Sequence, residues 1–387
     1  MEVHLGYIDM NYSFEIGPIR PPSEAYSLLL RVTRNCPWNR CRFCGLYKSE
    51  RFQLRSVAEV KEDIDTAKAI QDKIKELAWR QGLGTDIKQA TIQVLQNPPN
   101  ESFHNVALWM YAGSKTAFLQ DANTLIMRSN DLVEVIRYLK ETLPTINRIT
   151  SYGRSHTAAK KTLTDLIQLR EAGLSRIHIG LESGYDKLLK HMDKGVTAAV
   201  HITGGQKIVK SGISLSEYVL LGLGGREMWR EHAIETARVL NQIKPNFVRM
   251  RTLSVSNRIP LYEDIQEGIF TRQTDEEILE EEKLLIENLD CQTNFVSDHV
   301  GNLLQELEGK LPDDKERLLS IITRFNQLSE KERAHFIIGK RVGIYTYLND
   351  LQDPSKCEAV NKIISRLNQE EEGATVSAIH SLMERLT

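Results

Sequence analysis

Short β-like runs alternate with helical patterns from residue 27 to residue 255, and this alternation constrains the fold more than any other feature. Strands that alternate with helices form parallel βαβ units, so the sequence predicts an α/β protein with a parallel sheet. Six strands fit either an open doubly wound sheet or a partial barrel. The predicted strands are 27–34, 116–123, 148–154, 176–183, 214–225 and 246–255, and the predicted helices include 56–81, 130–143, 157–173 and 230–243.

The chemistry of the strand faces favours the barrel. A parallel sheet covered by helices on both sides should be apolar on both faces. In 176–182, however, one face carries Ile177, Ile179 and Leu181, and the other carries His178, Gly180 and Glu182. A polar face suits the interior of a partial (β/α)6 TIM-type barrel that encloses a wet cavity. Structural ion pairs near the strand ends are the alternative.

After residue 260 the pattern becomes helical and polar, as in 274–289 and 311–328. We therefore expect an N-terminal arm at 1–26, a barrel core at 27–260 and a helical C-terminal extension at 261–387. Within the core, Ser129 or Asn130 is the expected cap of helix 130–143, and Gly173 is expected to end helix 157–173.

The composition excludes several classes of protein. The 387 residues carry a formal charge of −2, so no bulk charge favours nucleic acid or a membrane surface. The first residues, MEVHLGYIDMNYSFEIGP, lack the pattern of a signal peptide, and no stretch is apolar enough to span a bilayer. A cytoplasmic location is therefore expected.

Three of the five cysteines lie together, in Asn35-Cys36-Pro37-Trp38-Asn39-Arg40-Cys41-Arg42-Phe43-Cys44. This segment follows a predicted strand, where barrels of this kind place their chemistry. Three thiolates can hold three irons of a [4Fe–4S] cluster and leave the fourth iron open. A structural zinc site would need a fourth ligand, such as His299, Cys291 or Cys357.

The cysteine segment resembles the signature of the radical S-adenosylmethionine (SAM) superfamily. The usual spacing there is C-x3-C-x2-C, with an aromatic residue before the last cysteine. Here the spacing is C-x4-C-x2-C, with Phe43 at the aromatic position. The resemblance implies that Cys36, Cys41 and Cys44 hold the cluster and that Phe43 packs near the adenine of SAM.

Four later segments extend the resemblance. Glu182 and Ser183, in GLESG, match the family's ribose-binding stretch, and Gly222 and Gly224, in LGLGG, match the glycine-containing stretch near the adenine. A tight turn is the alternative for the glycines. Toward the methionine part of SAM, the family often has a Gly-rich segment that meets the amino group; this sequence has Asp121 and Asn123 there instead, which suits polar recognition. Arg154, after the third strand, is the expected partner of the methionine carboxylate, because its guanidinium offers a fork.

The family chemistry implies reductive cleavage of SAM at a [4Fe–4S] cluster, giving a 5′-deoxyadenosyl radical that abstracts hydrogen from a substrate. An electron donor such as flavodoxin or ferredoxin is the implied partner. One alternative is an S-adenosylmethionine-dependent methyl or methylthio transferase. Another, from a different class, is a non-enzymatic structural metal-binding protein.

Arginines in the predicted cavity bear on the substrate. Arg31, Arg249 and Arg251 would place positive charge there, and buried cations need partners. Glu217 or an anionic substrate is the expected partner, with a purely structural ion-pair network as the alternative. His299 is expected at a helix start rather than in catalysis, and Cys291 as a structural thiol rather than a hydrogen donor.

Overall fold

The computed structural model describes residues 12–84 and 86–370. Residues 1–11 of the predicted arm and 371–387 of the predicted extension lie outside this part. In the described part the strands are β1 Leu28–Arg31, β2 Thr33–Arg34, β3 Gln53–Leu54, β4 Thr116–Gln120, β5 Arg148–Gly153, β6 Leu174–Glu182, β7 Ser214–Leu221, β8 Phe247–Thr252, β9 Thr293–Val296 and β10 Glu308–Leu311.

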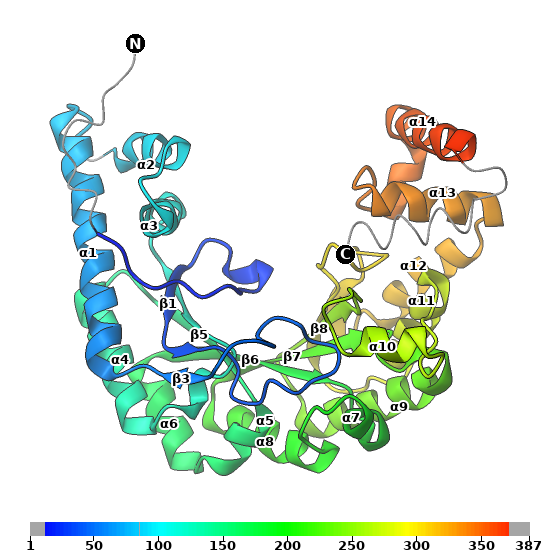
Figure 1. Ribbon diagram of the computed structural model, residues 1–387, viewed down its shortest axis with the longest axis horizontal. Coiled ribbons are helices and arrows are strands. Elements are labelled where there is room, and N and C mark those ends of the chain that lie inside the picture. The colour runs from blue at the N-terminus through cyan, green and yellow to red at the C-terminus, as the bar shows by residue number, and fades with distance from the viewer. Residues whose placement is uncertain (1–11, 85, 371–387) are drawn as a thin grey trace. The chain divides into compact units, whose positions relative to one another are not determined.

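The α-helices cover most of the remaining chain (Figure 1). They are α1 Val57–Arg80, α2 Ile87–Gln96, α3 Glu101–Tyr111, α4 Ser129–Thr142, α5 Ser155–Lys160, α6 Leu163–Ala172, α7 Asp186–His191, α8 Ala198–Ser211, α9 Gly225–Ile243, α10 Leu261–Gln266, α11 Asp275–Glu287, α12 Lys315–Asn326, α13 Glu330–Arg341 and α14 Pro354–Glu370. Short 3-10 helices are η1 Pro22–Glu24, η2 Thr124–Ile126 and η3 Leu348–Gln352. No helix in the described ranges combines the length and apolar character needed to cross a bilayer.

The main sheet has eight strands in the order β1-β4-β5-β6-β7-β8-β9-β10. A doubly wound sheet reverses its strand order in the middle, whereas this order follows the chain throughout. The pairs β1–β4, β4–β5, β5–β6, β7–β8 and β8–β9 are parallel, and β9–β10 is antiparallel. The predicted α/β fold of the partial barrel type is confirmed. Helices separate the six predicted strands, which are β1, β4, β5, β6, β7 and β8.

The described residues fall into two compact units. The first comprises the chain up to Pro37, Ser49–Ile179 and Lys207–Leu215. In it α1 packs against α4, and α4 packs against α6 (Figure 1). Buried apolar side chains on one face of β1, β4 and β5, among them Leu30, Leu119 and Ile149, form the core on which these helices rest.

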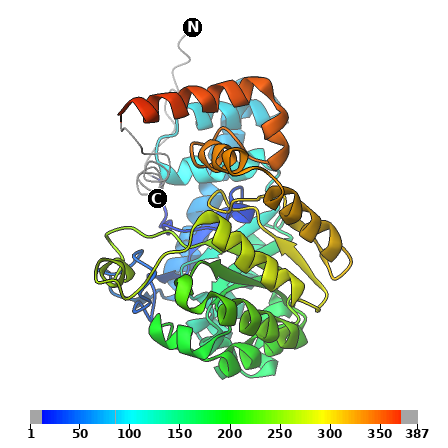
Figure 2. The ribbon, with the colours of Figure 1, turned by 90° about the vertical axis from the view of Figure 1, so that its right-hand side faces the viewer.

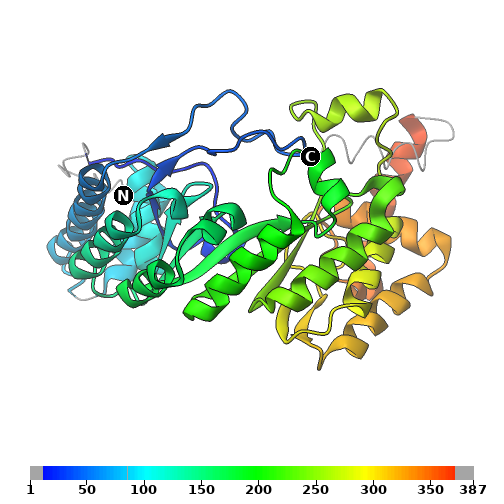
Figure 3. The same ribbon diagram turned by 90° about the horizontal axis from the view of Figure 1, so that it is seen from below.

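The second unit comprises Trp38–Lys48, Gly180–Gln206 and the chain from Ser216 onward. In it α11 packs against α9, in the green and yellow part of Figure 3, and against α12. The helices α12, α13 and α14 follow in the orange and red part of Figure 2. The region after residue 260 is mainly helical, as predicted, but it also contributes β9 and β10 to the sheet.

Helix ends follow local chemistry. The predicted helix 157–173 is two helices, because the Thr162 side chain caps α6 through a capping box with Asp165 and so breaks the run. Gly173 ends α6 with φ 130°, as expected. The predicted cap of α4 is wrong: Ser129 is its first residue, and the N-cap Arg128 makes no side-chain capping bond.

Candidate functional site

The cysteine segment spans the boundary of the two units. Cys36 follows β2 in the first unit, and Cys41 and Cys44 belong to the second; all three are half-buried. The backbone N–H of Cys44 donates to the carbonyl of Cys41 at 3.3 Å, and Lys48 Nζ donates to the same carbonyl at 2.8 Å. These two bonds fix a turn that carries the second and third cysteines.

Contacts with α7 and α10 anchor the loop Trp38–Lys48. The backbone of Arg42 donates to the Met192 carbonyl and accepts from the Leu261 N–H, both at 3.0 Å. Its guanidinium Nε donates to Asp264 at 3.0 Å. The cysteine loop is therefore held in the second unit by its own main chain and by a charge-assisted bond.

The Trp38 ring packs against Gly195, a position that has room for glycine only. Its indole Nε1 donates to the Asp193 carbonyl at 2.6 Å. A Cβ on Gly195 would lie 2.2 Å from the Trp38 ring, and Gly195 also has φ +69°. Any other residue at 195 would displace the ring and strain the backbone.

Lys194 joins two residues that the sequence assigned to SAM. Its Nζ donates to Glu182 Oε1 at 2.9 Å and lies 5.6 Å from the centre of the Phe43 ring. The predicted adenine-side aromatic and the predicted ribose carboxylate thus share one cation. Sequence reasoning missed Lys194, because no local pattern distinguishes it from a surface lysine.

Glu182 has an uncommon backbone conformation, with φ +62°. Such a conformation costs on the order of 1–3 kcal/mol for a residue other than glycine and is concentrated at functional sites. Gly180 makes room for it, since a Cβ there would lie 2.0 Å from Glu182 Oε1. The strained turn places the Glu182 carboxylate at the end of β6, where the ribose-binding role was predicted.

Ser183 and Gly222 are both engaged by buried polar groups. The Ser183 hydroxyl is fully buried, lies 2.8 Å from His232 Nδ1 and accepts from the Tyr185 N–H at 3.1 Å. The Gly222 N–H donates to Glu281 Oε1 at 3.0 Å, and Gly222 has φ +80°. Gly224 is the N-cap residue of α9. The glycine stretch is therefore a tight strand-to-helix turn as well as a candidate SAM contact.

In the first unit, Asp121 is fully buried and holds Arg31. Its Oδ2 accepts from Arg31 Nε at 3.2 Å and Nη2 at 2.9 Å, and from the Asn35 N–H at 3.2 Å. Arg31 Nη1 also pairs with Glu15 at 2.9 Å. Two carboxylates thus surround one guanidinium, next to the residue that precedes Cys36.

The structure brings Asn123 and Arg154 together at the ends of β4 and β5. Asn123 Oδ1 accepts from the Arg154 N–H at 3.0 Å, and its Nδ2 donates to Thr157 Oγ1 at 2.9 Å. Asn123 is buried and Arg154 is half-buried. Asn123 thereby fixes the backbone from which the predicted carboxylate-binding arginine projects.

Two arginines of β8 share one carboxylate in the second unit. Asp298 accepts from Arg249 Nη1 at 3.0 Å and from Arg251 Nη1 at 3.1 Å. Arg249 is 6% exposed, and its Nε has no hydrogen-bond partner among the described residues. Burial, and then Asp298, raise the pKa of the nearby Glu308 carboxyl, while Arg249 lowers it. One buried and one half-buried cation thus directly contact a single anion.

The expectation that Glu217 pairs with these arginines is wrong. In the β7–β8 register Tyr218 lies opposite Arg249, so Glu217 points to the other face of β7. Glu217 is fully buried, and burial raises its pKa well above the ordinary value. Arg251 instead stacks over the Tyr218 ring, with 4.7 Å from its Cζ to the ring centre.

Three further residues differ from expectation or add to it. His299 does not start a helix: it follows β9, and its Nδ1 accepts from the Gly301 N–H at 3.1 Å. Burial and then Arg251 lower the pKa of His299 to about 4. His178 does not line a wet space, because it is fully buried against the rings of Phe118 and Tyr152. Burial raises the pKa of Cys291 to about 11, which suits a structural thiol.

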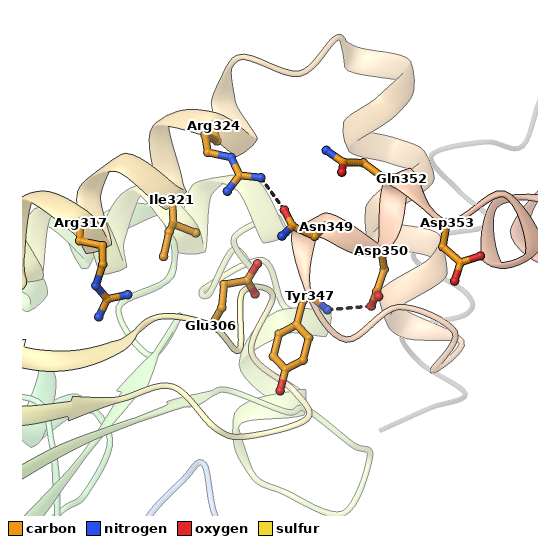
Figure 4. Close-up of a pocket in the computed structure, with 9 residues that line it drawn as sticks. All are labelled: Glu306, Arg317, Ile321, Arg324, Tyr347, Asn349, Asp350, Gln352 and Asp353. Carbon is orange, nitrogen blue, oxygen red and sulfur yellow. Dashed lines mark hydrogen bonds between the residues drawn. The ribbon is translucent and has the colours of Figure 1, made fainter.

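A pocket of about 660 Å³ lies elsewhere in the second unit (Figure 4). Its charged groups already bond to protein: Arg324 Nη2 donates to Asn349 at 2.7 Å, and Asp350 accepts from the Tyr347 N–H at 2.9 Å. None of the predicted site residues lines it. Across residues 12–84 and 86–370, the structure forms no cluster of three or more His, Cys, Asp or Glu side chains that could hold a metal ion.

The decisive comparison is with protein families. The family model of the radical SAM superfamily matches residues 30–237, more than half of the 387 residues. The chain belongs to the radical SAM superfamily. Its enzymes use a [4Fe–4S] cluster and SAM, so these are the cofactors of this protein, and the cysteine segment lies inside the match.

Solved radical SAM structures show weaker likeness. Elp3 from the archaeon Methanocaldococcus infernus is 14% identical at a TM-score of 0.41, covering 55% of this chain and 55% of that one. Methylornithine synthase is 16% identical at 0.40, covering 69% and 65%. The methyltransferase TsrM from Kitasatospora setae is 15% identical at 0.42, covering 62% and 38%. The chain thus spans less than two thirds of each. No curated protein matches it.

Proposed function

We propose that this radical SAM enzyme abstracts hydrogen from a substrate that carries an anionic group, such as a carboxylate or phosphate. The observation that supports the substrate class is the excess of cations on β8, where Arg249 and Arg251 share Asp298. A buried guanidinium without its own anion is costly, and a bound anion would offset that cost. The substrate's anion would then form a charge-assisted, bidentate contact.

In this proposal Cys36, Cys41 and Cys44 hold the cluster. Thiolates are the ligands that iron–sulfur clusters take, and three of them leave one iron open for SAM. The turn at Cys41–Cys44 and the bond from Lys48 support a loop shaped for this purpose. When bound, the cluster and SAM supply a 5′-deoxyadenosyl radical. The protein holds the reactants in place and excludes water.

The remaining predicted site residues are proposed SAM contacts. Glu182 accepts hydrogen bonds from the ribose hydroxyls, and Phe43 packs near the adenine, with Lys194 fixing both. Ser183, Gly222 and Gly224 shape the two strand ends. Asp121, Asn123 and Arg154 serve the methionine part, and Asp121 does so through its hold on Arg31.

Three broader expectations remain part of the proposal. Residues 27–260 form the catalytic core, 261–387 the extension and 1–26 the arm. A flavodoxin or ferredoxin in the cytoplasm supplies the electron that SAM cleavage needs. Dithionite replaces that donor in the tests below.

The cofactor assignment is tested by anaerobic reconstitution. Wild-type protein should hold about four irons and four sulfides and, with SAM and dithionite, release 5′-deoxyadenosine. Cys41→Ala should lose the brown absorbance and the product, because the cluster loses one of three ligands. Cys357→Ser, outside the motif in α14, is the matched control and should keep both. Stoichiometric zinc without labile sulfide in the wild type would contradict the proposal and indicate a structural metal site.

A further inference from the structure

A line of buried polar side chains connects the ends of β6 and β7 with α11. Ser183 Oγ lies 2.8 Å from His232 Nδ1, and His232 Nε2 lies 3.3 Å from Glu281 Oε1. Glu281 Oε1 also accepts from the Gly222 N–H at 3.0 Å. Ser183, His232 and Glu281 are all 0% exposed. The line therefore has no contact with solvent.

The hydrogen-bond partners define which group donates and which accepts at each contact along this line. His232 Nε2 faces two acceptors, the Leu220 carbonyl at 3.2 Å and Glu281, so Nε2 carries a proton. With the proton on Nε2, Nδ1 is the acceptor of this tautomer, so the Ser183 hydroxyl donates a hydrogen bond to it at 2.8 Å, and the Thr236 hydroxyl lies 3.3 Å away. The Ser183 oxygen is left to accept from the Tyr185 N–H. Each group thus has one consistent role.

Burying these polar groups costs free energy, because they lose their contacts with water. Glu281 Oε2 is buried with no hydrogen-bond partner among the described residues. The neighbouring Glu282 is also buried, and burial, with Glu281, raises its pKa to about 8. Apolar side chains would fill the same space at lower cost, since buried carboxyls must be desolvated. The polar line is explained if it positions the backbone at its two ends.

We infer that His232 and Glu281 are positioning residues of the SAM site, holding the turn after β6 and the turn after β7 in one fixed arrangement. The inference rests on the proposed contacts of Glu182 and Gly222 with SAM. It also assigns a role to α11, which lies beyond the residues 30–237 of the family match. The extension thereby completes a site that the core alone would leave loosely held.

The test measures SAM binding directly, on the anaerobically reconstituted full chain, by equilibrium dialysis without reductant. Glu281→Gln should weaken SAM binding about tenfold, because an amide replaces the carboxyl group that contacts both the Gly222 N–H and His232 Nε2. Iron and sulfide content should not change. Glu280→Gln, half-exposed on the same helix and bonded to Asn326, is the matched control and should bind SAM like the wild type.

A second variant guards against simple misfolding. Ser183→Ala removes one hydroxyl and should weaken SAM binding severalfold, and its effect should not add to that of Glu281→Gln, because both belong to one line. Unchanged SAM affinity in folded Glu281→Gln protein, or full additivity with Ser183→Ala, would overturn the inference. Failure of the wild type itself to bind SAM would instead reject the proposed function.

Discussion

Two arginine clusters of this protein differ in how fully nearby carboxylates neutralise their positive charge. Arg31, in the first unit, is surrounded by Asp121 and Glu15, so its charge is fully compensated. Arg249 and Arg251, in the second unit, share Asp298 as their one ion-pair partner among the described residues. A compensated cation can serve the fold, whereas a cluster with surplus charge can bind the anionic group that we propose for the substrate. The difference lies in the count of nearby carboxylates.

Arg31→Met should break the compensated cluster and cause the largest loss of stability. Asp121 would remain buried without its cation, which costs about 3–5 kcal/mol. Thermal unfolding of the full chain measures the loss. Arg128→Met, at an arginine whose side chain is 86% exposed and pairs with Asp131, should cost well under about 1 kcal/mol. Equal losses in the two variants would contradict the comparison.

Arg251→Met should mainly affect anion binding. The lost charge-assisted contact should weaken binding of sulfate, used as a probe dianion, by at least about tenfold. The measurement is the rise of the unfolding temperature with sulfate, relative to sodium chloride of equal ionic strength. The difference between variant and wild type cancels the general effect of sulfate on proteins. An undiminished sulfate response would remove the support for an anionic substrate.

Asp298→Asn should act with the opposite sign on the same probe. The internal anion that competes with sulfate is removed, so sulfate should bind severalfold more tightly. Without sulfate the variant should be somewhat less stable than the wild type, because two guanidiniums then lie close together uncompensated. The sulfate titration described for Arg251 measures both effects. Weaker sulfate binding would show that Asp298 orients the arginines more than it neutralises them.

His299→Ala should have the smallest effect. With its pKa lowered to about 4, the His299 imidazole is neutral above about pH 5 and adds no positive charge. Sulfate affinity between pH 6 and pH 8 should therefore change by less than about twofold. Only as the pH falls toward 4 should the histidine gain charge and strengthen anion binding. A wild-type rise in affinity between pH 8 and pH 6 that the variant lacks would contradict this.

The sequence predicted features that depend on local pattern. Alternating apolar runs predicted β4, β5 and β8, and Gly173 ended its helix because a positive φ suits glycine. The family signature predicted the cofactors from ten consecutive residues. Helices α2 and α3 were not predicted, although Asp86 and Asn100 cap them.

Features that depend on tertiary contact could not be predicted. Asp298 lies on a loop 47 residues after Arg251, and only the parallel pairing of β8 and β9 brings it close. One residue of register decides that Tyr218, not Glu217, shares a face with Arg249. Lys194 and Glu281 likewise follow from packing, since neither carries a local signature. The family and its cofactors could therefore be predicted from the sequence, whereas the packing partners of the candidate site residues could not.

The pairing of β9 with β8 has a practical consequence. Val248 and Arg249 of β8 lie opposite Phe295 and Val296 of β9. A protein shortened after residue 260 would present the bare edge of β8 to solvent, and such unprotected edges recruit strands from other molecules. Truncation would thus be expected to give aggregated material rather than an isolated catalytic domain.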